Sequence, residues 1–355
     1  MKKERVLVAM SGGVDSAVCA YLVTQKGMCA DGITMRLWDK NERICNSIET
    51  APDKNCIDAE LICRRLGIKH RAIALGDSFR KQVVDRFISE YINGLTPNPC
   101  VDCNKHIKFG SLMEVAISES YDYLATGHYA RIECNNGNYV IKKALDEKKD
   151  QTYFLWAIKK EYLPHIIFPL GDMTKEEIRG IARQNAFESA ERSDSQDICF
   201  IENGDYAAFI CKETNRKFPC GSFIAPDGRI LGTHTGIINY TVGQRKGLGI
   251  ALGRPVFVGK KDVANNTVIL CDNEELFSST LTAHSVNLLT DTSLLTPMQV
   301  TAKIRYRHSP ANAKAQILPD GRLKVDFEEP QRAITPGQSV VLYDGDILLG
   351  GGIIE

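Results

Sequence analysis

A short apolar segment followed by a glycine-rich loop constrains the fold of this chain most strongly. Residues 6–10 (VLVAM) are typical of a buried strand, residues 11–16 read SGGVDS, and an amphipathic stretch continues to Gln25 before Gly27. Two adjacent glycines let the backbone turn sharply, and the N-terminus of the following helix offers free N–H groups to an anion. The segment therefore predicts a strand–loop–helix cradle for phosphate or pyrophosphate. It lacks the lysine of the GxxxxGK[ST] loop, and an ordinary strand–helix turn is the alternative.

Strand-like and helix-like segments alternate up to about residue 204. The strand-like segments are 32–38, 70–75 and 123–132, and the helix-like segments are 58–66, 79–92 and 109–120. This alternation predicts an α/β doubly wound parallel sheet with helices on both faces. Short alternating segments with Gly, Pro, Asn and Asp turns follow, which indicates two small mostly-β domains. We expect domains at 1–204, 205–277 and 278–355.

Composition excludes several classes of protein. The 355 residues are 43% hydrophobic and 25% charged, as in globular proteins, and no apolar run is long enough for a membrane helix. The first ten residues do not form a signal peptide, so we expect a cytoplasmic protein whose 12 cysteines are mostly reduced. The 44 basic residues balance the 44 acidic ones, so any nucleic-acid surface must be a local patch.

The loop at residues 11–16 resembles the signature of the ATP pyrophosphatases, the PP-loop group. These enzymes adenylate a substrate oxygen and release pyrophosphate, and they include GMP, argininosuccinate and asparagine synthetases as well as tRNA-modifying enzymes. The resemblance implies ATP with magnesium as the cofactor. It also implies that ATP is bound by Ala9, Met10, Ser11, Gly12, Gly13, Val14, Asp15, Ser16, Met35 and Gly127. For Met35, core packing is the alternative.

Further motifs narrow the resemblance to the tRNA-specific 2-thiouridylases, over nearly the whole chain. They are residues 96–105 (TPNPCVDCNK), 125–131 (ATGHYAR), 149–151 (KDQ), 193–200 (SDSQDICF), 243–249 (GQRKGLG) and 335–338 (TPGQ). The resemblance implies ATP-dependent 2-thiolation of the wobble uridine of tRNAs for Lys, Glu and Gln. The C2 oxygen would be adenylated, a cysteine persulfide would supply sulfur, and AMP and pyrophosphate would be released. A cysteine desulfurase or sulfur-relay protein would be the sulfur donor.

Two cysteines receive roles from this resemblance. Cys199 is expected to carry the persulfide, and Cys103 to be the nucleophile that releases the carried sulfur and forms a disulfide with Cys199. Thiol exchange proceeds through thiolates, so a cation should lie near both, with Lys105 and Arg192 as candidates. Most other cysteines are expected in the core, as small apolar residues. These are Cys19, Cys29, Cys63, Cys134, Cys211, Cys220 and Cys271, whereas Cys45 and Cys56 flank a polar loop and could be exposed.

Cys100 opens an alternative to the persulfide. With Cys103 it forms a CxxC pair, and with Cys199 it would complete three thiolates able to hold an iron–sulfur cluster. His106 follows at CxxCxxH spacing, so zinc is a further alternative. We prefer the persulfide because it requires only two thiols, and we assign no metal.

The expected tRNA contacts lie in separate segments. The resemblance implies contacts from His128, Lys148, Lys149, Asp150, Gln151, Arg305, Tyr306 and Gln338. Residues 228–261 hold six Lys or Arg and no acid, and residues 292–319 also lack acids. Residues 303–307 (KIRYR) alternate, which predicts a strand with three cations on one face. Such patches bind phosphates, although a charge run can equally be a solvated surface.

Two other functions compete with tRNA thiolation. Another adenylating enzyme, such as an amidotransferase-linked synthetase, would have no use for Cys103 together with Cys199. A tRNA-binding protein without catalysis would need neither the intact SGGVDS loop nor that cysteine pair.

Overall fold

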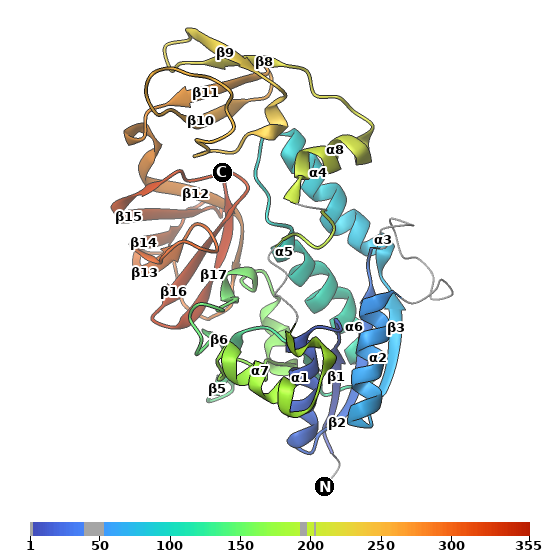
Figure 1. Cartoon of the computed structure of the whole chain (residues 1–355). Helices are drawn as coiled ribbons and strands as arrows, with labels where there is room; N and C mark the ends of the chain where they lie inside the picture. Colours follow the sequence, from blue (N-terminus) through green and yellow to red (C-terminus); the bar gives the residue numbers. More distant parts are fainter. Residues whose placement is uncertain (1–2, 39–52, 192–196, 202–203) are drawn as a thin grey trace.

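The computed structural model describes residues 3–38, 53–191, 197–201 and 204–355. Figure 1 shows a parallel sheet with its helices at the bottom, a closed barrel on one side and a small sheet at the top. No helix within the described ranges combines the length and the apolar character that crossing a membrane requires.

The N-terminal sheet is parallel throughout and has the order β3-β2-β1-β4-β7. The chain therefore winds outward from β1 in both directions, and the switch point lies between β1 and β4. Ligands of such sheets bind beyond the carboxyl ends of the strands at this point. The strands are β1 (Arg5–Ala9), β2 (Cys29–Arg36), β3 (Lys69–Ala74), β4 (Tyr123–Ala125) and β7 (Ile166–Ile167).

Helices cover both faces of this sheet, which confirms the predicted doubly wound fold. On β1, Val6 and Val8 pack with α1, α2 and α7, whereas Leu7 packs on the opposite face with α6. These helices are α1 (Val14–Gln25), α2 (Lys54–Leu66), α6 (Leu112–Ser118) and α7 (Lys175–Gln184).

Two predicted helices extend or bend in ways that the sequence did not indicate. The segment 79–92 forms α3 (Gly76–Phe79), the π-helix η1 (Arg80–Val84) and α4 (Asp85–Ile92). The helix expected at 109–120 begins earlier, with α5 (Pro99–Asp102) and the π-helix η2 (Cys103–Ser111) preceding α6. Wide π turns are frequent at functional sites, and η2 begins at Cys103.

One predicted strand is wrong. Residues 123–132 were expected to be continuous, but β4 ends at Ala125 and β5 (Ala130–Asn135) belongs to another sheet. The chain leaves the parallel sheet at Thr126 and Gly127, then pairs as a hairpin with β6 (Asn138–Lys143). Strand β17 (Ile347–Ile354), which belongs to the C-terminal sheet described next, pairs with β6 through Ile347↔Lys142. The hairpin therefore joins the N-terminal part of the chain to that C-terminal sheet.

The barrel is an antiparallel sheet closed on itself. Its order is β12-β15-β14-β13-β16-β17, and β12 also pairs with β17. Trp156 Nε1 donates to Ser339 Oγ at 3.0 Å, which ties the barrel to the N-terminal unit. The barrel strands are β12 (Phe277–Leu288), β13 (Met298–Lys303), β14 (Ala311–Ile317), β15 (Leu323–Arg332), β16 (Ser339–Asp344) and β17 (Ile347–Ile354).

The strand expected at 303–307 is also wrong, because β13 ends at Lys303 and residues 304–308 form a turn. Ile304 is buried, and the Arg305 guanidinium donates to the carbonyl oxygens of Arg332 and Ala333. These contacts bend the chain back onto the end of β15 instead of continuing the ladder.

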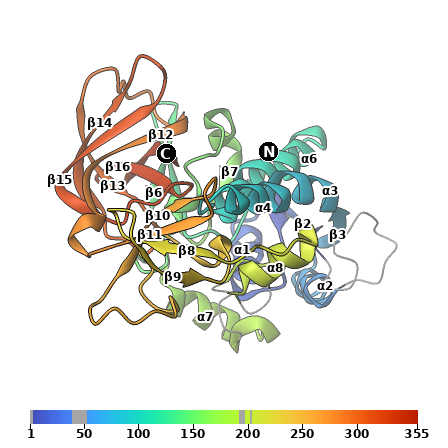
Figure 2. The same ribbon diagram turned by 90° about the horizontal axis from the view of Figure 1, so that it is seen from above.

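The small sheet has the order β10-β11-β8-β9 and packs against α4 and α8. Figure 1 and Figure 2 both show α8 next to α4, to one side of this sheet. Phe87 of α4, Phe223 of β8 and Phe200 share one apolar cluster. The elements are α8 (Tyr206–Thr214), β8 (Gly221–Ile224), β9 (Ile230–His234), β10 (Phe257–Asp262) and β11 (Thr267–Cys271). Short helices complete the chain: η3 (Thr152–Phe154), η4 (Lys160–His165), η5 (Glu188–Glu191), η7 (Ile237–Asn239) and η8 (Glu274–Leu276).

Candidate active site

The loop 11–16, here called the phosphate loop, is closed by its own serines. Ser16 Oγ donates to Gly13 O at 3.0 Å and accepts from Ser11 N at 3.2 Å. Gly12 has a positive φ of 73°, and a Cβ there would lie 2.6 Å from Asn55 O. The loop therefore needs glycine at this position, and it leads into α1 with Gly13 as the N-cap.

Asp15 of the phosphate loop is held by two side chains that the sequence did not identify. Its carboxylate accepts from Lys175 Nζ at 2.8 and 3.0 Å and from Tyr129 OH at 2.8 Å. Lys175 is the first residue of α7 and is nearly buried. A capping box between Thr174 and Glu177 marks the start of this helix in the sequence, but nothing local indicates its contact with Asp15.

The other predicted ATP residues lie at the same edge of the sheet. Gly127 follows β4, and a Cβ on it would lie 2.9 Å from the backbone carbon of Asp15. Met35 lies near the end of β2 and is partly buried against two apolar clusters. The structure thus brings Gly127 directly onto the phosphate loop, and it gives Met35 a packing role at the neighbouring strand end.

The structure brings Cys100, Cys103 and Cys199 together. Cys100 lies in α5 and Cys103 begins η2, and the thiols of Cys100 and Cys199 both influence the pKa of Cys103. The residues Cys100 and Cys199 are exposed to solvent and Cys103 is half-buried. Many protein atoms nevertheless lie around each of the three sulfur atoms, which amounts to partial burial of the thiols. This burial raises the pKa of Cys103 to about 12 and that of Cys199 to about 11, and a thiolate on one cysteine raises the pKa of its neighbours further.

The three cysteines Cys100, Cys103 and Cys199 are here called the thiol centre. The cation near them is Lys108, so the expectation that Lys105 is this cation is wrong. Lys108 lowers the pKa of all three thiols against the effect of burial. Lys105 instead acts on Asp102 and His106, because it projects from another side of the same helix. The other candidate, Arg192, lies outside the described residues, as do residues 193–196 of the second cysteine motif.

Within the ranges that the structure describes, no group of three or more His, Cys, Asp or Glu side chains is arranged to hold a metal ion. His106, the fourth ligand of the zinc alternative, has Lys105 and Arg86 as its charged neighbours. The arrangement of these residues thus gives no support to zinc.

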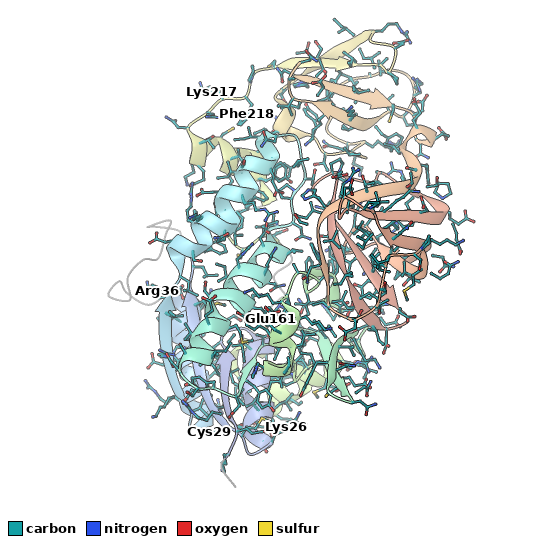
Figure 3. All side chains as sticks on the ribbon, turned by 180° about the vertical axis from the view of Figure 1, so that it is seen from behind. Lys26, Cys29, Arg36, Glu161, Lys217 and Phe218 are labelled. Atoms are coloured by element: carbon teal, nitrogen blue, oxygen red, sulfur yellow. The ribbon has the colours of Figure 1, made fainter. Side chains whose placement is uncertain are left out.

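The remaining cysteines divide between core and surface. Cys19, Cys63 and Cys271 are buried, as predicted. The core prediction is wrong for the exposed Cys29, Cys134 and Cys220, and Cys211 is half-buried. Figure 3 shows Cys29 near Lys26 at the end of the sheet opposite the phosphate loop. Cys56 is buried in α2 rather than exposed, and Cys45 lies outside the described residues.

His128 is buried beside the thiol centre. Its Nδ1 lies 2.7 Å from Thr126 Oγ1 and its Nε2 lies 3.3 Å from Lys108 Nζ. Burial, with Lys108 as the second cause, holds the pKa of His128 well below its usual value, so the ring is neutral near pH 7. Both ring nitrogens are thus engaged inside the protein.

The other predicted tRNA residues form two groups at the junction with the barrel. Asp150 is buried and accepts from Thr152 Oγ1 at 2.7 Å, while Gln151 Oε1 accepts from Tyr129 N at 2.9 Å. Gln338 Nε2 donates to Thr96 O at 2.8 Å. Lys148 is exposed and Lys149 is half-buried. The ring centroids of Tyr306 and Phe154 are 4.5 Å apart, and Arg305 binds the backbone as described above.

The basic patch expected at 228–261 is smaller than the sequence indicated. Arg229 pairs with Asp227 at 2.7 Å and Arg254 pairs with Asp272, two acids just outside that segment. Lys261 Nζ is buried. The side chains of Arg245, Lys246 and Lys260 are exposed.

Contacts connect the phosphate loop to the thiols. Gly127 packs on Asp15, the adjacent His128 contacts Lys108, and Lys108 influences the three cysteines. On the barrel side, burial is the main cause that raises the pKa of Tyr306, Asp150 is the second, and a thiolate on nearby Cys100 adds a smaller increase. The predicted nucleotide and sulfur residues are therefore linked by successive contacts beside the junction of the N-terminal sheet and the barrel.

Three family models match the chain. A "tRNA methyl transferase HUP domain" matches residues 4–203, a "tRNA methyl transferase PRC-barrel domain" matches 207–272, and an "Aminomethyltransferase beta-barrel domain" matches 278–354. A solved 4-thiouridine synthetase–RNA complex with bound ATP covers 60% of this chain and 50% of its own, with a TM-score of 0.36 and 14% identity. That similarity is too low to carry an argument.

Curated relatives match over the full length. The "tRNA-specific 2-thiouridylase MnmA" of Acetivibrio thermocellus is 45% identical, covering 100% of both chains. The protein of the same name from Clostridioides difficile is 44% identical, covering 99% of this chain and 98% of its own. Identity at this level over whole chains shows common family membership, and this chain therefore belongs to the tRNA-specific 2-thiouridylase family.

Proposed function

We propose that the chain uses ATP to convert a uridine of tRNA to 2-thiouridine. The observation that carries this proposal is the continuity between the phosphate loop and three clustered thiols, through Gly127, His128 and Lys108. An adenylating enzyme of another kind has no need of thiols beside its nucleotide site. The names of the full-length relatives support the same reaction.

The first step is activation of the uridine C2 oxygen. The phosphate loop binds the phosphates of ATP through backbone N–H groups at the start of α1, with Asp15 oriented by Lys175 and Tyr129. Magnesium would neutralise phosphate charge there, and Asp15 is the carboxylate of the loop that could bind it. Attack of the C2 oxygen on the α-phosphate joins AMP to the uridine and releases pyrophosphate.

The second step is sulfur transfer. Cys199 carries a persulfide, Cys199–S–SH, and the Cys103 thiolate attacks the sulfur bonded to Cys199 carbon. The internal S–S bond breaks, a Cys103–Cys199 disulfide forms, and hydrosulfide leaves. The hydrosulfide attacks C2 and displaces AMP, which gives 2-thiouridine. An external reductant of thiols restores the two cysteines. Cys100 has no role in this sequence.

The surroundings of the site fit a tRNA substrate. The target uridine must leave the stack before its C2 edge can enter a pocket. Lys148, Tyr306 and Gln338 lie at the junction where an extruded nucleotide would enter, and the exposed Arg245 and Lys246 would bind phosphates farther away. We propose the wobble uridine of tRNAs for Lys, Glu and Gln as the target, and a cysteine desulfurase or relay protein as the sulfur donor.

The proposed division of labour follows from this arrangement. Residues 1–204 would bind ATP and hold the thiols, residues 205–277 would form a central domain, and residues 278–355 would contact tRNA. All eleven described cysteines are free thiols, which suits the reducing conditions of the cytoplasm.

The test is to identify the products of ATP in the presence of unmodified tRNA and a sulfur source. We expect AMP and pyrophosphate in step with 2-thiouridine, and no turnover when tRNA is omitted. Asp15→Ala should lose turnover but keep most of the tRNA affinity, because the exposed cations proposed to bind tRNA phosphates, Arg245 and Lys246, lie in another segment. ADP and orthophosphate as products, or ATP cleavage without thiolated tRNA, would refute the proposal.

A further inference from the structure

Lys108 is a cation whose immediate partner is not an acid. It lies in η2, and its Nζ is 3.3 Å from His128 Nε2. An ammonium group can only donate, so Nε2 accepts and the ring proton resides on Nδ1. Nδ1 then donates to Thr126 Oγ1 at 2.7 Å. These two bonds fix both the tautomer and the orientation of the imidazole.

The imidazole is itself held by packing. Its ring contacts Phe109 and Phe168, with centroids 5.7 and 5.8 Å away, and the side chain is almost completely buried. A neutral, fixed ring orients the ammonium without neutralising its charge. Among the described residues, no carboxylate lies within ion-pair distance of Lys108, so its charge stays available to other groups.

Those other groups are the thiols. Lys108 is the single described side chain that favours the thiolate form of Cys100, Cys103 and Cys199 alike. Three effects disfavour the thiolate form: burial, the repulsion among the three sulfurs, and the charge of Asp102 near Cys100 and Cys103. Tyr306 faces Cys100 from the barrel.

The π-helix explains this placement. Cys103 and Lys108 are five residues apart, and the wide turn of a π-helix pairs residues at a spacing of five. Lys105, two residues after Cys103, lies around the helix and acts on Asp102 instead. An ordinary α-helical turn would rotate Lys108 away from the side that Cys103 occupies.

We propose that Lys108, oriented by His128 and Thr126, supplies the positive charge that stabilises sulfur anions at the thiol centre. The role of this charge in catalysis rests on the proposed function. In the sulfur-transfer step, the Lys108 ammonium stabilises the Cys103 thiolate before it attacks and the hydrosulfide after it leaves. His128 and Thr126 are positioning residues, because they act through Lys108.

The experiment measures thiol alkylation in the full-length protein without ATP or tRNA, so its result does not depend on the proposed reaction. Iodoacetamide labelling of Cys103 and Cys199 is followed by peptide mass spectrometry from neutral to alkaline pH. Cys29, exposed at the far end of the sheet, is the internal reference in each sample. Lys105→Met, on the same helix, is the matched control.

We expect Lys108→Met to slow alkylation of Cys103 and Cys199 and to shift their pH profiles upward. An opposite charge within a few ångströms changes a pKa by about one to three units. At a pH below the thiol pKa, each unit by which that pKa rises lowers the alkylation rate about threefold, because the smaller thiolate fraction is partly offset by a more nucleophilic thiolate. Lys108→Arg, which keeps the charge, should restore most of the rate. Lys105→Met should leave both rates unchanged.

Equal rates in native and Lys108→Met protein would overturn the proposal, as would an equal slowing by Lys105→Met. A variant that fails to fold would reveal itself by faster labelling of Cys19, which is fully buried in the native fold. Lys108→Gln then takes its place in the same assay. Loss of thiolation with unchanged alkylation would count against Lys108 but not against the proposed function.

Discussion

At the residue scale, Gly127 occupies a position beside the phosphate loop that has room only for glycine. Its Cα lies so close to Asp15 that a Cβ would be 2.9 Å from a backbone carbon and 3.1 Å from the carbonyl oxygen. Backbone cannot move aside as a flexible side chain can, so any substitution must shift the phosphate loop or β4.

We therefore predict that Gly127→Ala weakens ATP binding by about tenfold or more, since a displacement of about 1 Å in a site can cost about a hundredfold in rate. Equilibrium titration with ATP measures the effect. Gly180→Ala is the control, because a Cβ at Gly180 of α7 meets no atom within 4 Å. Equal affinity in both variants would show that Gly127 is not part of the nucleotide site.

The residues that the sequence revealed and those that it concealed differ in kind. Cys103, Cys199 and the phosphate loop stand in contiguous motifs, so local pattern was sufficient to propose them. Lys175 meets Asp15 across 160 positions of sequence. The π-helix η2 places Lys108 on the side of the helix that Cys103 occupies, and no local sequence pattern predicted a π-helix there. Long-range pairing and helix irregularity are properties of the folded chain, so these two residues required the structure.

At the element scale, the ion pair between Lys175 and Asp15 joins α7 to the phosphate loop. Lys175 is 11% exposed and Asp15 is 33% exposed in this pair, whereas the Arg64–Glu60 pair on α2 is 72% and 52% exposed. Solvent screening weakens the second pair far more than the first.

We predict that Lys175→Met lowers the free energy of unfolding by about 1–2 kcal/mol, because it leaves a partly buried carboxylate without its cation. Arg64→Gln should cost about 0.5 kcal/mol or less, as is typical of exposed i,i+4 pairs. Denaturant unfolding followed by circular dichroism compares the two variants. A larger effect for Arg64→Gln would contradict the anchoring role of Lys175.

The elements themselves were predicted well where periodicity was uninterrupted. The helix expected at 58–66 does end at Leu66, where Gly67 follows with a φ of 69°. Errors arose where tertiary contacts overrode local pattern. The segment 123–132 divides between two sheets, and 303–307 turns because Arg305 binds the backbone at the end of β15. The alternation of KIRYR reflects contacts of that turn rather than a strand.

At the scale of the whole molecule, the barrel is joined to the N-terminal unit by backbone pairing and side-chain bonds. Strand β17 pairs with β6, and Gln338 binds the carbonyl of Thr96 in the segment that leads to Cys100. A tRNA held by the barrel would therefore lie beside the thiols. The neutral net charge of the chain leaves this binding to local cations.

We predict that Arg245→Ala with Lys246→Ala weakens tRNA binding and flattens its dependence on salt. Removing a cation that neutralises one phosphate should reduce the logarithmic salt slope by about one unit. Arg229→Ala is the control, since Arg229 is already paired with Asp227. If the double variant and the control have the same slope, this part of the central domain is only a solvated surface.

The most direct measurement is 2-thiouridine formed by persulfide-loaded, iron-free enzyme from ATP and unmodified tRNA, quantified by mass spectrometry of the nucleosides. The account predicts that native enzyme and Cys100→Ser both form 2-thiouridine, that Cys199→Ser forms none, and that Cys103→Ser stalls with the persulfide still on Cys199. An inactive iron-free enzyme, with activity that returns on anaerobic addition of iron and sulfide and requires Cys100 as well, would contradict it.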